Sequence, residues 1–223
     1  MPNSAEAVAS KDAKRMSRSL FISLDGLDGT GKSTQCRLLA EWLREQGHRV
    51  QTCADPGGTE VGKILRSLVL EHRGEINVPC EALLFMASRA QLVGEIIKPA
   101  LARGEIVVSD RFMLANVVYQ GHAGGLDPDL LWRIGRMATG GLEPDLTLVL
   151  DSLLEVAGRR LRGPRDRMES RPVEFQTSVR NGFLNEARRR PECMHIVDAS
   201  GSVESVQAAI REFVIPRLES LNR

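Results

Sequence analysis

One segment constrains this chain more than any other: Gly26 to Ser33 matches the pattern G-x-x-x-x-G-K-[ST]. An apolar run, Leu20 to Leu24, precedes it and predicts a strand. The stretch from Lys32 to Gln46 carries apolar residues at spacings of three and four, which predicts a helix. A strand before and a helix after are the context in which this pattern indicates a nucleotide site. Ordinary residue frequencies would produce a chance match in on the order of one chain in a hundred, so we interpret the segment as a phosphate-binding loop.

The residue types of this loop fit a phosphate group. Glycines let the backbone wrap closely and point its N–H groups inward, and the following helix adds its positive dipole end. Lys32 is expected to reach the β- and γ-phosphates of a nucleoside triphosphate such as ATP, and the Ser33 hydroxyl to bind Mg²⁺. The predicted nucleotide-binding residues are Gly26, Leu27, Asp28, Gly29, Thr30, Gly31, Lys32, Ser33 and Thr34.

Two further aspartates end apolar runs. Asp110 follows Ile106-Val107-Val108 and resembles the second carboxylate of such sites, which holds magnesium directly or through water. A strand-end aspartate that only caps the next helix is the alternative interpretation. Asp151 ends the run Leu146 to Leu150 without a neighbouring motif, and we interpret it as structural.

Short apolar runs alternate with amphipathic stretches along the chain, which favours an α/β fold with a parallel sheet. The five predicted strands cover Leu20–Leu24, His48–Cys53, Glu105–Asp110, Leu146–Leu150 and Met194–Val197. The predicted helices cover 32–46, 59–71, 79–103, 112–121, 127–139, 172–190 and 202–220. We therefore expect a single three-layer P-loop NTPase domain over 19–223, with ligands at the carboxyl ends of the strands. Residues 1–18 are polar and are expected to form a disordered tail.

Charge and cysteine usage exclude several classes of protein. The 30 basic residues nearly balance the 29 acidic ones, whereas general nucleic-acid binders carry a basic excess. The four cysteines form no C-x-x-C pair, which favours free thiols in a reducing compartment. No run approaches the ~20 apolar residues that a membrane span needs. We therefore expect a cytoplasmic protein that binds neither nucleic acid nor membrane.

An arginine-rich segment lies between residues 157 and 172 and surrounds Gly163-Pro164, which predicts a break in any helix. A solvated basic face is the usual explanation of such a run. Beside a phosphate-binding loop, a mobile basic lid that closes over a triphosphate and neutralises developing charge is the alternative. The arginines of this segment are Arg159, Arg160, Arg162, Arg165, Arg167 and Arg171.

The remaining motifs separate the classes of P-loop protein. The N-K-x-D motif of guanine-nucleotide switches is missing, and the loop differs from that of adenylate kinases. From Leu20 to the carboxyl end the chain resembles the thymidylate (dTMP) kinase family. The motifs that carry this resemblance are the loop 24–33, Asp55-Pro56-Gly57-Gly58-Thr59, Leu84-Phe85 with Arg89, 97–101, Asp110-Arg111-Phe112, Tyr119-Gln120-Gly121, 144–151 and Asp166-Arg167-Met168-Glu169.

The resemblance implies transfer of the γ-phosphoryl group of ATP to dTMP, which gives dTDP for dTTP supply. It implies that Phe85 stacks on the thymine ring and that Arg89 and Asn116 hydrogen-bond its edge. Arg111 is expected to hold the acceptor phosphate, and Asp28 to face the deoxyribose and the magnesium region. The implied acceptor-binding residues are Asp28, Pro56, Phe85, Arg89, Arg111, Asn116, Tyr119 and Gln120, and the implied metal-binding residues are Ser33, Asp28 and Asp110.

Members of this family carry their catalytic arginine either in the phosphate loop or in the lid. Gly29 stands where the first type has arginine, so the resemblance implies a bacterial-type enzyme with a lid arginine, and also a homodimer. Arg167 is the first candidate. The catalytic residues implied overall are Lys32, Arg111, Arg167, Asp28, Arg159 and Arg160.

The chain departs from the family pattern at Ala54, where an arginine is common, and at Ala115, where many members have serine. Two other hypotheses stay open at this point. The first is another nucleoside monophosphate or deoxynucleoside kinase of the same fold. The second is a non-catalytic module that binds a nucleotide and signals by lid closure, which the density of phosphate-directed groups disfavours.

Overall fold

The computed structural model describes residues 19–72, 74–161 and 166–221. Within this part of the chain, a five-stranded, fully parallel sheet has the strand order β2-β3-β1-β4-β5. The strands are β1 (Leu20–Gly26), β2 (Val50–Ala54), β3 (Ile106–Asp110), β4 (Leu146–Asp151) and β5 (Met194–Asp198). This confirms the predicted α/β fold with five parallel strands between helical layers.

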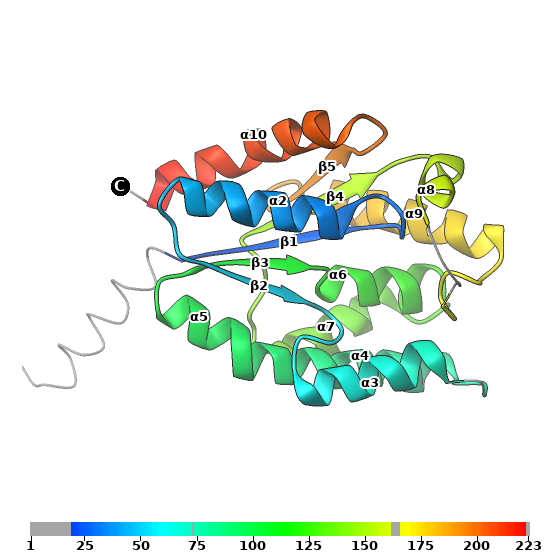
Figure 1. Cartoon of the computed structure of the whole chain (residues 1–223). Coiled ribbons are helices and arrows are strands. Elements are labelled where there is room, and N and C mark those ends of the chain that lie inside the picture. Colours follow the sequence, from blue (N-terminus) through cyan, green and yellow to red (C-terminus); the bar gives the residue numbers. More distant parts are fainter. Residues whose placement is uncertain (1–18, 73, 162–165, 222–223) are drawn as a thin grey trace, which may run out of the picture.

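Helices cover both faces of the sheet (Figure 1). On one face lie α2 (Lys32–Glu45) and α10 (Val203–Leu221). The other face is covered by α4 (Val78–Leu92), η1 (Val93–Ile97), α5 (Lys98–Ala102), α6 (Met113–Asn116), η2 (Val117–His122), α7 (Pro128–Thr139) and α9 (Val173–Arg189). Two more helices, α3 (Glu60–Glu71), which packs on α4, and α8 (Leu154–Arg160), complete the described elements.

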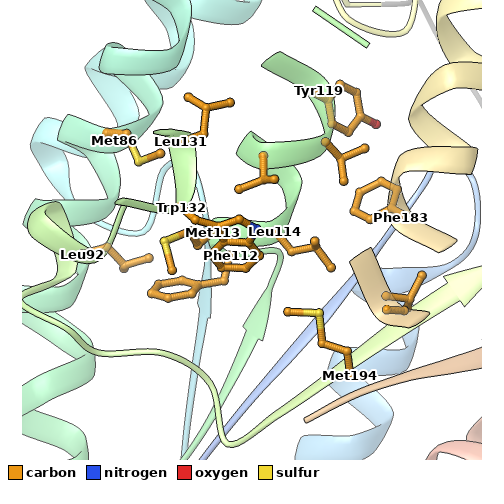
Figure 2. Close-up of a cluster of buried hydrophobic side chains, with 14 of the residues drawn as sticks. Met86, Leu92, Phe112, Met113, Leu114, Tyr119, Leu131, Trp132, Phe183 and Met194 are labelled. Carbon is orange, nitrogen blue, oxygen red and sulfur yellow. The ribbon is translucent and has the colours of Figure 1, made fainter. Parts of the chain in front are cut away.

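The alternation of side chains along β1 explains why the core has two halves. Ile22 and Leu24 point into the cluster beneath α2 and α10, whereas Phe21 points into the cluster beneath α4, α6, α7 and α9. Figure 2 shows the second cluster, in which Tyr119 lies at the edge of an otherwise apolar group. Parallel strands that are covered on both faces have to be apolar on both faces, so the strand runs were readable from the sequence.

Most predicted helix boundaries lie within two residues of those observed, and the differences have physical reasons. The predicted helix over 79–103 is interrupted by the wider turn η1, and the one over 112–121 by η2. Both are π-helical, and such insertions leave no periodicity that a sequence pattern can show. The short helix α8 was not predicted, because its seven residues are too few to show a helical repeat of apolar positions.

Several predictions from the sequence have a structural outcome or fall outside the described residues. Asp151 forms a bidentate ion pair with Arg180, at 2.7 and 2.8 Å, which agrees with its structural interpretation. All four cysteines are free. No helix of the described chain combines the length and apolar character that crossing a membrane requires. The tail over 1–18, and Arg162 to Arg165 in the lid, lie outside the described residues.

Candidate active site

The carboxyl ends of β1, β2 and β3 bring the predicted motifs together. In the parallel register Leu24 and Ala54 both lie beside Asp110. The backbone N–H of Arg111 donates to the Leu24 carbonyl at 2.9 Å, and that of Asp55 donates to the Asp110 carbonyl at 3.0 Å. Segments that are far apart in the sequence therefore converge on the loop that joins β1 to α2.

Lys32 opens α2 and turns back over the loop. Its Nζ donates to the Leu27 carbonyl at 2.6 Å and lies 3.7 Å from a carboxylate oxygen of Asp28. Burial lowers the pKa of Lys32 to about 8, and the neighbouring Arg111 cation acts in the same direction. Little water surrounds this ammonium group, so its electrostatic attraction to a polyphosphate is stronger than it would be in bulk solvent.

Ser33 and Asp110 form the part of the site that suits a magnesium ion. The Ser33 hydroxyl donates to Asp110 Oδ2 at 2.5 Å, so the two predicted ligands are adjacent. Within the described residues, no group of three or more histidine, cysteine or acidic side chains gathers closely enough to hold a metal alone. Mg²⁺ usually takes one or two protein oxygens and completes its shell with water and phosphate, so the residues present fit this ion.

Asp28, in the same loop, contacts Arg111 and Tyr119. One of its carboxylate oxygens accepts from Arg111 Nη2 at 2.5 Å, and the other accepts from the Tyr119 hydroxyl at 3.0 Å. Burial alone would raise the pKa of Asp28, but the Arg111 and Lys32 cations hold it well below the ordinary value. Asp28 is therefore a fixed anion that orients an arginine and a tyrosine.

Arg111 has the features of a side chain built for a ligand. Its φ of 68° lies in the left-handed region that residues other than glycine rarely occupy, and such strain concentrates at functional sites. Its Nη1 is buried and forms no hydrogen bond within the described chain. The unused nitrogen of an otherwise fixed guanidinium can bind one more anionic oxygen.

Asp25 is a buried carboxylate beneath the same cluster. Neither of its oxygens has a hydrogen-bond partner among the described residues. Burial raises its pKa to about 6, against the lowering effect of the Arg111, Lys32 and Arg89 cations. A buried carboxylate without such partners costs stability unless ordered water satisfies it.

Two pockets meet at this cluster. The first is lined by all eight predicted acceptor residues, Asp28, Pro56, Phe85, Arg89, Arg111, Asn116, Tyr119 and Gln120. The second is lined by the loop from Asp28 to Gln35 and by Asp110, and also by Arg160 in α8 and by Gly201 to Val203 before and in α10. The residues common to both pockets are Asp28, Asp55, Pro56, Arg66 and Arg111. The two pockets therefore adjoin, and Asp28 and Arg111 belong to the wall that they share.

Arg89 forms the inner wall of the first pocket and is almost fully buried. Its Nε donates to Asp55 Oδ2 at 2.5 Å, its Nη1 to Asn116 Oδ1 at 3.2 Å and its Nη2 to the Phe112 carbonyl at 3.3 Å. Burial raises the pKa of Asp55, and the Arg89 cation opposes that change. The Asp55 carboxylate therefore holds Arg89 directly.

The three candidate lid arginines occupy different positions. The Arg160 guanidinium donates to the carbonyls of Ala199, Ser200 and Gly201, which fixes α8 to the loop before α10. Arg159 is exposed, and its side chain forms no hydrogen bond or ion pair with a described residue. Arg167 pairs with Glu81 and donates to the Val69 carbonyl at 2.8 Å, so in this arrangement it lines neither pocket.

Gly29 shows why the loop itself carries no arginine. Its φ is 81°, and a Cβ at this position would lie 2.1 Å from the carbonyl oxygen of Ala157 in α8. The phosphate-binding loop therefore packs backbone against backbone on the lid helix, and a side chain at position 29 would displace that helix.

Comparisons with known proteins identify the family. The thymidylate kinase family model matches residues 24–210. The chain belongs to the thymidylate kinase family. Thymidylate kinase of Rhodopirellula baltica is 47% identical over 190 residues, which are 85% of this chain and 78% of that protein. Thymidylate kinase of Symbiobacterium thermophilum is 47% identical over 205 residues, 89% of this chain and 95% of that protein.

A solved structure gives the same result in three dimensions. The crystal structure of thymidylate kinase from Ehrlichia chaffeensis superimposes with a TM-score of 0.74 at 29% sequence identity. The superposition covers 88% of this chain and 98% of that chain. A thymidylate kinase is a phosphotransferase, which agrees with a site that contains many phosphate-directed groups.

Sequence reasoning missed several residues of this thymidylate kinase site. Arg66, Leu70, Asp166 and Met168 line the first pocket, and Leu161, Glu169, Gly201, Ser202, Val203 and Val206 line the second. Most of these carry no motif and reach the site only through folding. Asp25 had a readable signal, because a charged residue inside the strand run from Leu20 onward contradicts a purely structural role for that run.

The raised pKa of Asp25 predicts how stability depends on pH. Between its ordinary value of 3.8 and about 6 the unfolded chain ionises this group more readily than the folded protein, so its contribution to stability falls as pH rises through that window. We expect Asp25→Asn to raise the thermal unfolding midpoint of the ligand-free protein at about pH 7 but not at about pH 4. Thermal melts over this pH range measure the effect.

The matched control is Asp198→Asn. Asp198 also ends a strand, but it is exposed, and hydrogen bonds from Ser200 hold its pKa below the ordinary value. This variant should give no gain at neutral pH. An equal gain for Asp25→Asn at both pH values would show that burial of its charge is not the cause.

Proposed function

We propose that this chain transfers the γ-phosphoryl group of ATP to the 5′-phosphate of dTMP and produces dTDP for dTTP synthesis. The observation that carries the proposal is the pair of pockets that share Asp28 and Arg111. A phosphoryl group can pass in line between two nucleotides only if their phosphates meet, and the shared wall is where they would meet. Membership of the thymidylate kinase family supports dTMP as the acceptor.

The acceptor phosphate would be held by Arg111. Its Nη2 is bound to Asp28, and its Nη1 has no hydrogen-bond partner among the described residues, so a phosphate oxygen would complete the guanidinium without breaking a pair between them. Because the acceptor phosphate is already an oxyanion, no general base has to remove a proton. Catalysis then consists of positioning and of stabilising charge during transfer.

The thymine base would lie deeper in the first pocket. Phe85 is half-buried in its wall and presents an aromatic face for stacking, and Arg89 and Asn116 present polar atoms to the base edge. The Tyr119 ring lies 5.2 Å from the Arg111 guanidinium and would pack beside the deoxyribose, where it leaves little room for a 2′-hydroxyl. Gln120 and Pro56 complete the acceptor site.

ATP would occupy the second pocket, with Lys32 on its β- and γ-phosphates and the loop N–H groups around them. Ser33 and Asp110 would hold the accompanying Mg²⁺, with Asp28 facing it from the acceptor side. When bound, the ion would neutralise negative charge on the phosphates. The protein's own part is to hold the lysine, the arginine and both nucleotides in a fixed relation.

A coupled ADP-release assay with an acceptor panel tests the proposal. We expect efficient turnover with dTMP, and far less with dUMP, UMP, dCMP, dGMP, AMP or thymidine. Lys32→Ala is the control, because it should abolish turnover while leaving the fold intact by circular dichroism. Preference for another monophosphate would favour the alternative of a different nucleoside monophosphate kinase. ATP binding without turnover of any acceptor would favour the non-catalytic nucleotide-binding module.

The lid would supply the catalytic arginine, because position 29 has no room for one. If Arg167 acts on the transferred group, it has to leave Glu81 when the lid closes. We expect Arg167→Ala to lower kcat by ~10³-fold or more, as for an arginine that stabilises phosphoryl transfer. Single-turnover kinetics measure this, with Arg159→Ala and Arg160→Ala in parallel. A change confined to KM would instead make Arg167 a binding or anchoring residue.

We also propose a cytoplasmic homodimer. Support comes from α3, where Val61, Ile64 and Leu68 are 47%, 69% and 42% exposed and follow one helical face. We expect the protein to sediment as a dimer and Ile64→Glu to shift it toward monomer. Lys63→Glu on the same helix is the control for added charge. A wild-type protein that sediments as a monomer would overturn the proposal.

A further inference from the structure

A chain of buried side chains connects the lid to the edge that would read the base. Gln120 Nε2 donates to Glu81 Oε1 at 2.7 Å, and Asn116 Nδ2 donates to Gln120 Oε1 at 2.6 Å. Asn116 Oδ1 then accepts from Arg89 Nη1 at 3.2 Å. Glu81 lines neither pocket, whereas the other three residues line the first.

The two ends of this chain determine its direction. A carboxylate such as that of Glu81 only accepts hydrogen bonds, and the Arg89 guanidinium only donates them. Gln120 therefore has to turn its NH₂ toward Glu81 and its oxygen toward Asn116. Asn116 in turn has to direct its NH₂ at Gln120, which leaves its carbonyl oxygen beside Arg89. Neither amide can flip without placing two donors or two acceptors face to face in a buried site.

Glu81 contacts two arginines on its other side. Its Oε2 pairs with Arg167 and lies 3.5 Å from Arg171, and the residue is only 1% exposed. It also sits in the first turn of α4, where the helix dipole favours negative charge. In the ligand-free arrangement, the Glu81 carboxylate therefore lies between two arginines and the first of two neutral amides.

The resulting edge has a defined polarity. Asn116 Oδ1 is an acceptor with a second lone pair, and beside it the Arg89 guanidinium is a donor. Thymine presents a donor at N3–H next to an acceptor at O4, whereas cytosine presents an acceptor at N3 next to an amino donor. An acceptor beside a donor therefore complements thymine and opposes cytosine.

We propose that Glu81 is a positioning residue that fixes the orientation of Gln120 and Asn116 and thereby makes the site discriminate thymine from cytosine nucleotides. The inference rests on the proposed function, in which Asn116 and Arg89 read the base edge. Glu81 itself touches no substrate. It acts because its carboxylate only accepts hydrogen bonds and therefore excludes the flipped orientation of the Gln120 amide.

The test compares kcat/KM for dTMP with kcat/KM for dCMP. This ratio is informative because effects of Glu81 on lid closure act on the shared donor, ATP, and cancel between the two acceptors. Glu81→Gln introduces a donor at the head of the relay and should lower the dTMP-to-dCMP ratio by about tenfold or more, the discrimination that one well-placed polar pair provides. An unchanged ratio in a folded variant overturns the inference.

Glu81→Asp separates polarity from packing. Aspartate keeps the acceptor-only carboxylate but removes a methylene and shortens its reach, whereas glutamine keeps the shape and loses the charge. If polarity is what matters, Asp should preserve the ratio better than Gln. If Glu81 only fills space, Asp should be the more damaging change, and that order also overturns the inference.

Glu186→Gln is the matched control. Glu186 is equally buried, accepts from Trp132 Nε1 at 3.0 Å and pairs with Arg189 and His122 at 3.0 and 2.9 Å, but it lines neither pocket. Its removal should lower the melting temperature and leave the ratio unchanged. A fall in the ratio equal to that of Glu81→Gln would show that any loss of a buried carboxylate has the effect.

Two further variants separate this inference from the proposed function. Gln120→Met interrupts the relay without touching the Glu81–Arg167 pair and should lower the ratio even if Glu81→Gln fails to fold. Asn116→Ala tests the base edge itself. If only Asn116→Ala lowers the ratio, the base site stands and the role of Glu81 is overturned. If it too leaves the ratio unchanged, the base site assignment fails, and the inference fails with it.

Discussion

The parallel pairing of β1 with β3 places the charges on which the site depends. Because Leu24 lies beside Asp110, the loop after β1 and the Asp110-Arg111 turn after β3 begin at the same level of the sheet. Three carboxylates, those of Asp25, Asp28 and Asp110, then share a small volume with two cations, Lys32 and Arg111. Lys32 lies close to Asp28, and Arg111 is bonded to it. A shift of the register by one residue would separate these partners and leave buried charges without compensation.

The same arrangement leaves some buried polar atoms without hydrogen-bond partners. Nη1 of Arg111, both oxygens of Asp25 and one oxygen of Asp55 are buried and have no partner among the described residues. Such atoms cost stability in the ligand-free protein. Of these residues, Arg111 and Asp55 line both pockets, where a ligand or ordered water would satisfy their atoms. These unsatisfied atoms lower the stability of the ligand-free protein, and a ligand that satisfied them would remove that cost and bind more tightly.

The sequence predicted those parts of the molecule that have a local cause. The strand runs and the phosphate-binding loop were readable because period and glycine spacing fix them, and the family motifs selected eight residues that line a single pocket. The wider turn η2, which carries Tyr119 and Gln120, was not readable, since it depends on packing against α7 and α9. Nor was the partner of Arg167: Glu81 lies 86 residues away, and no local pattern pairs them. The position of Arg160 on the loop before α10 was invisible for the same reason.

The contact between Gly29 and the Ala157 carbonyl has an evolutionary consequence. A lineage with this geometry cannot acquire a loop arginine by one substitution, because the side chain would first collide with α8. Helix α8 has to move before such a change becomes tolerable. Position 29 and the backbone of α8 therefore constrain each other, and a larger side chain in the loop requires an earlier change that displaces the helix.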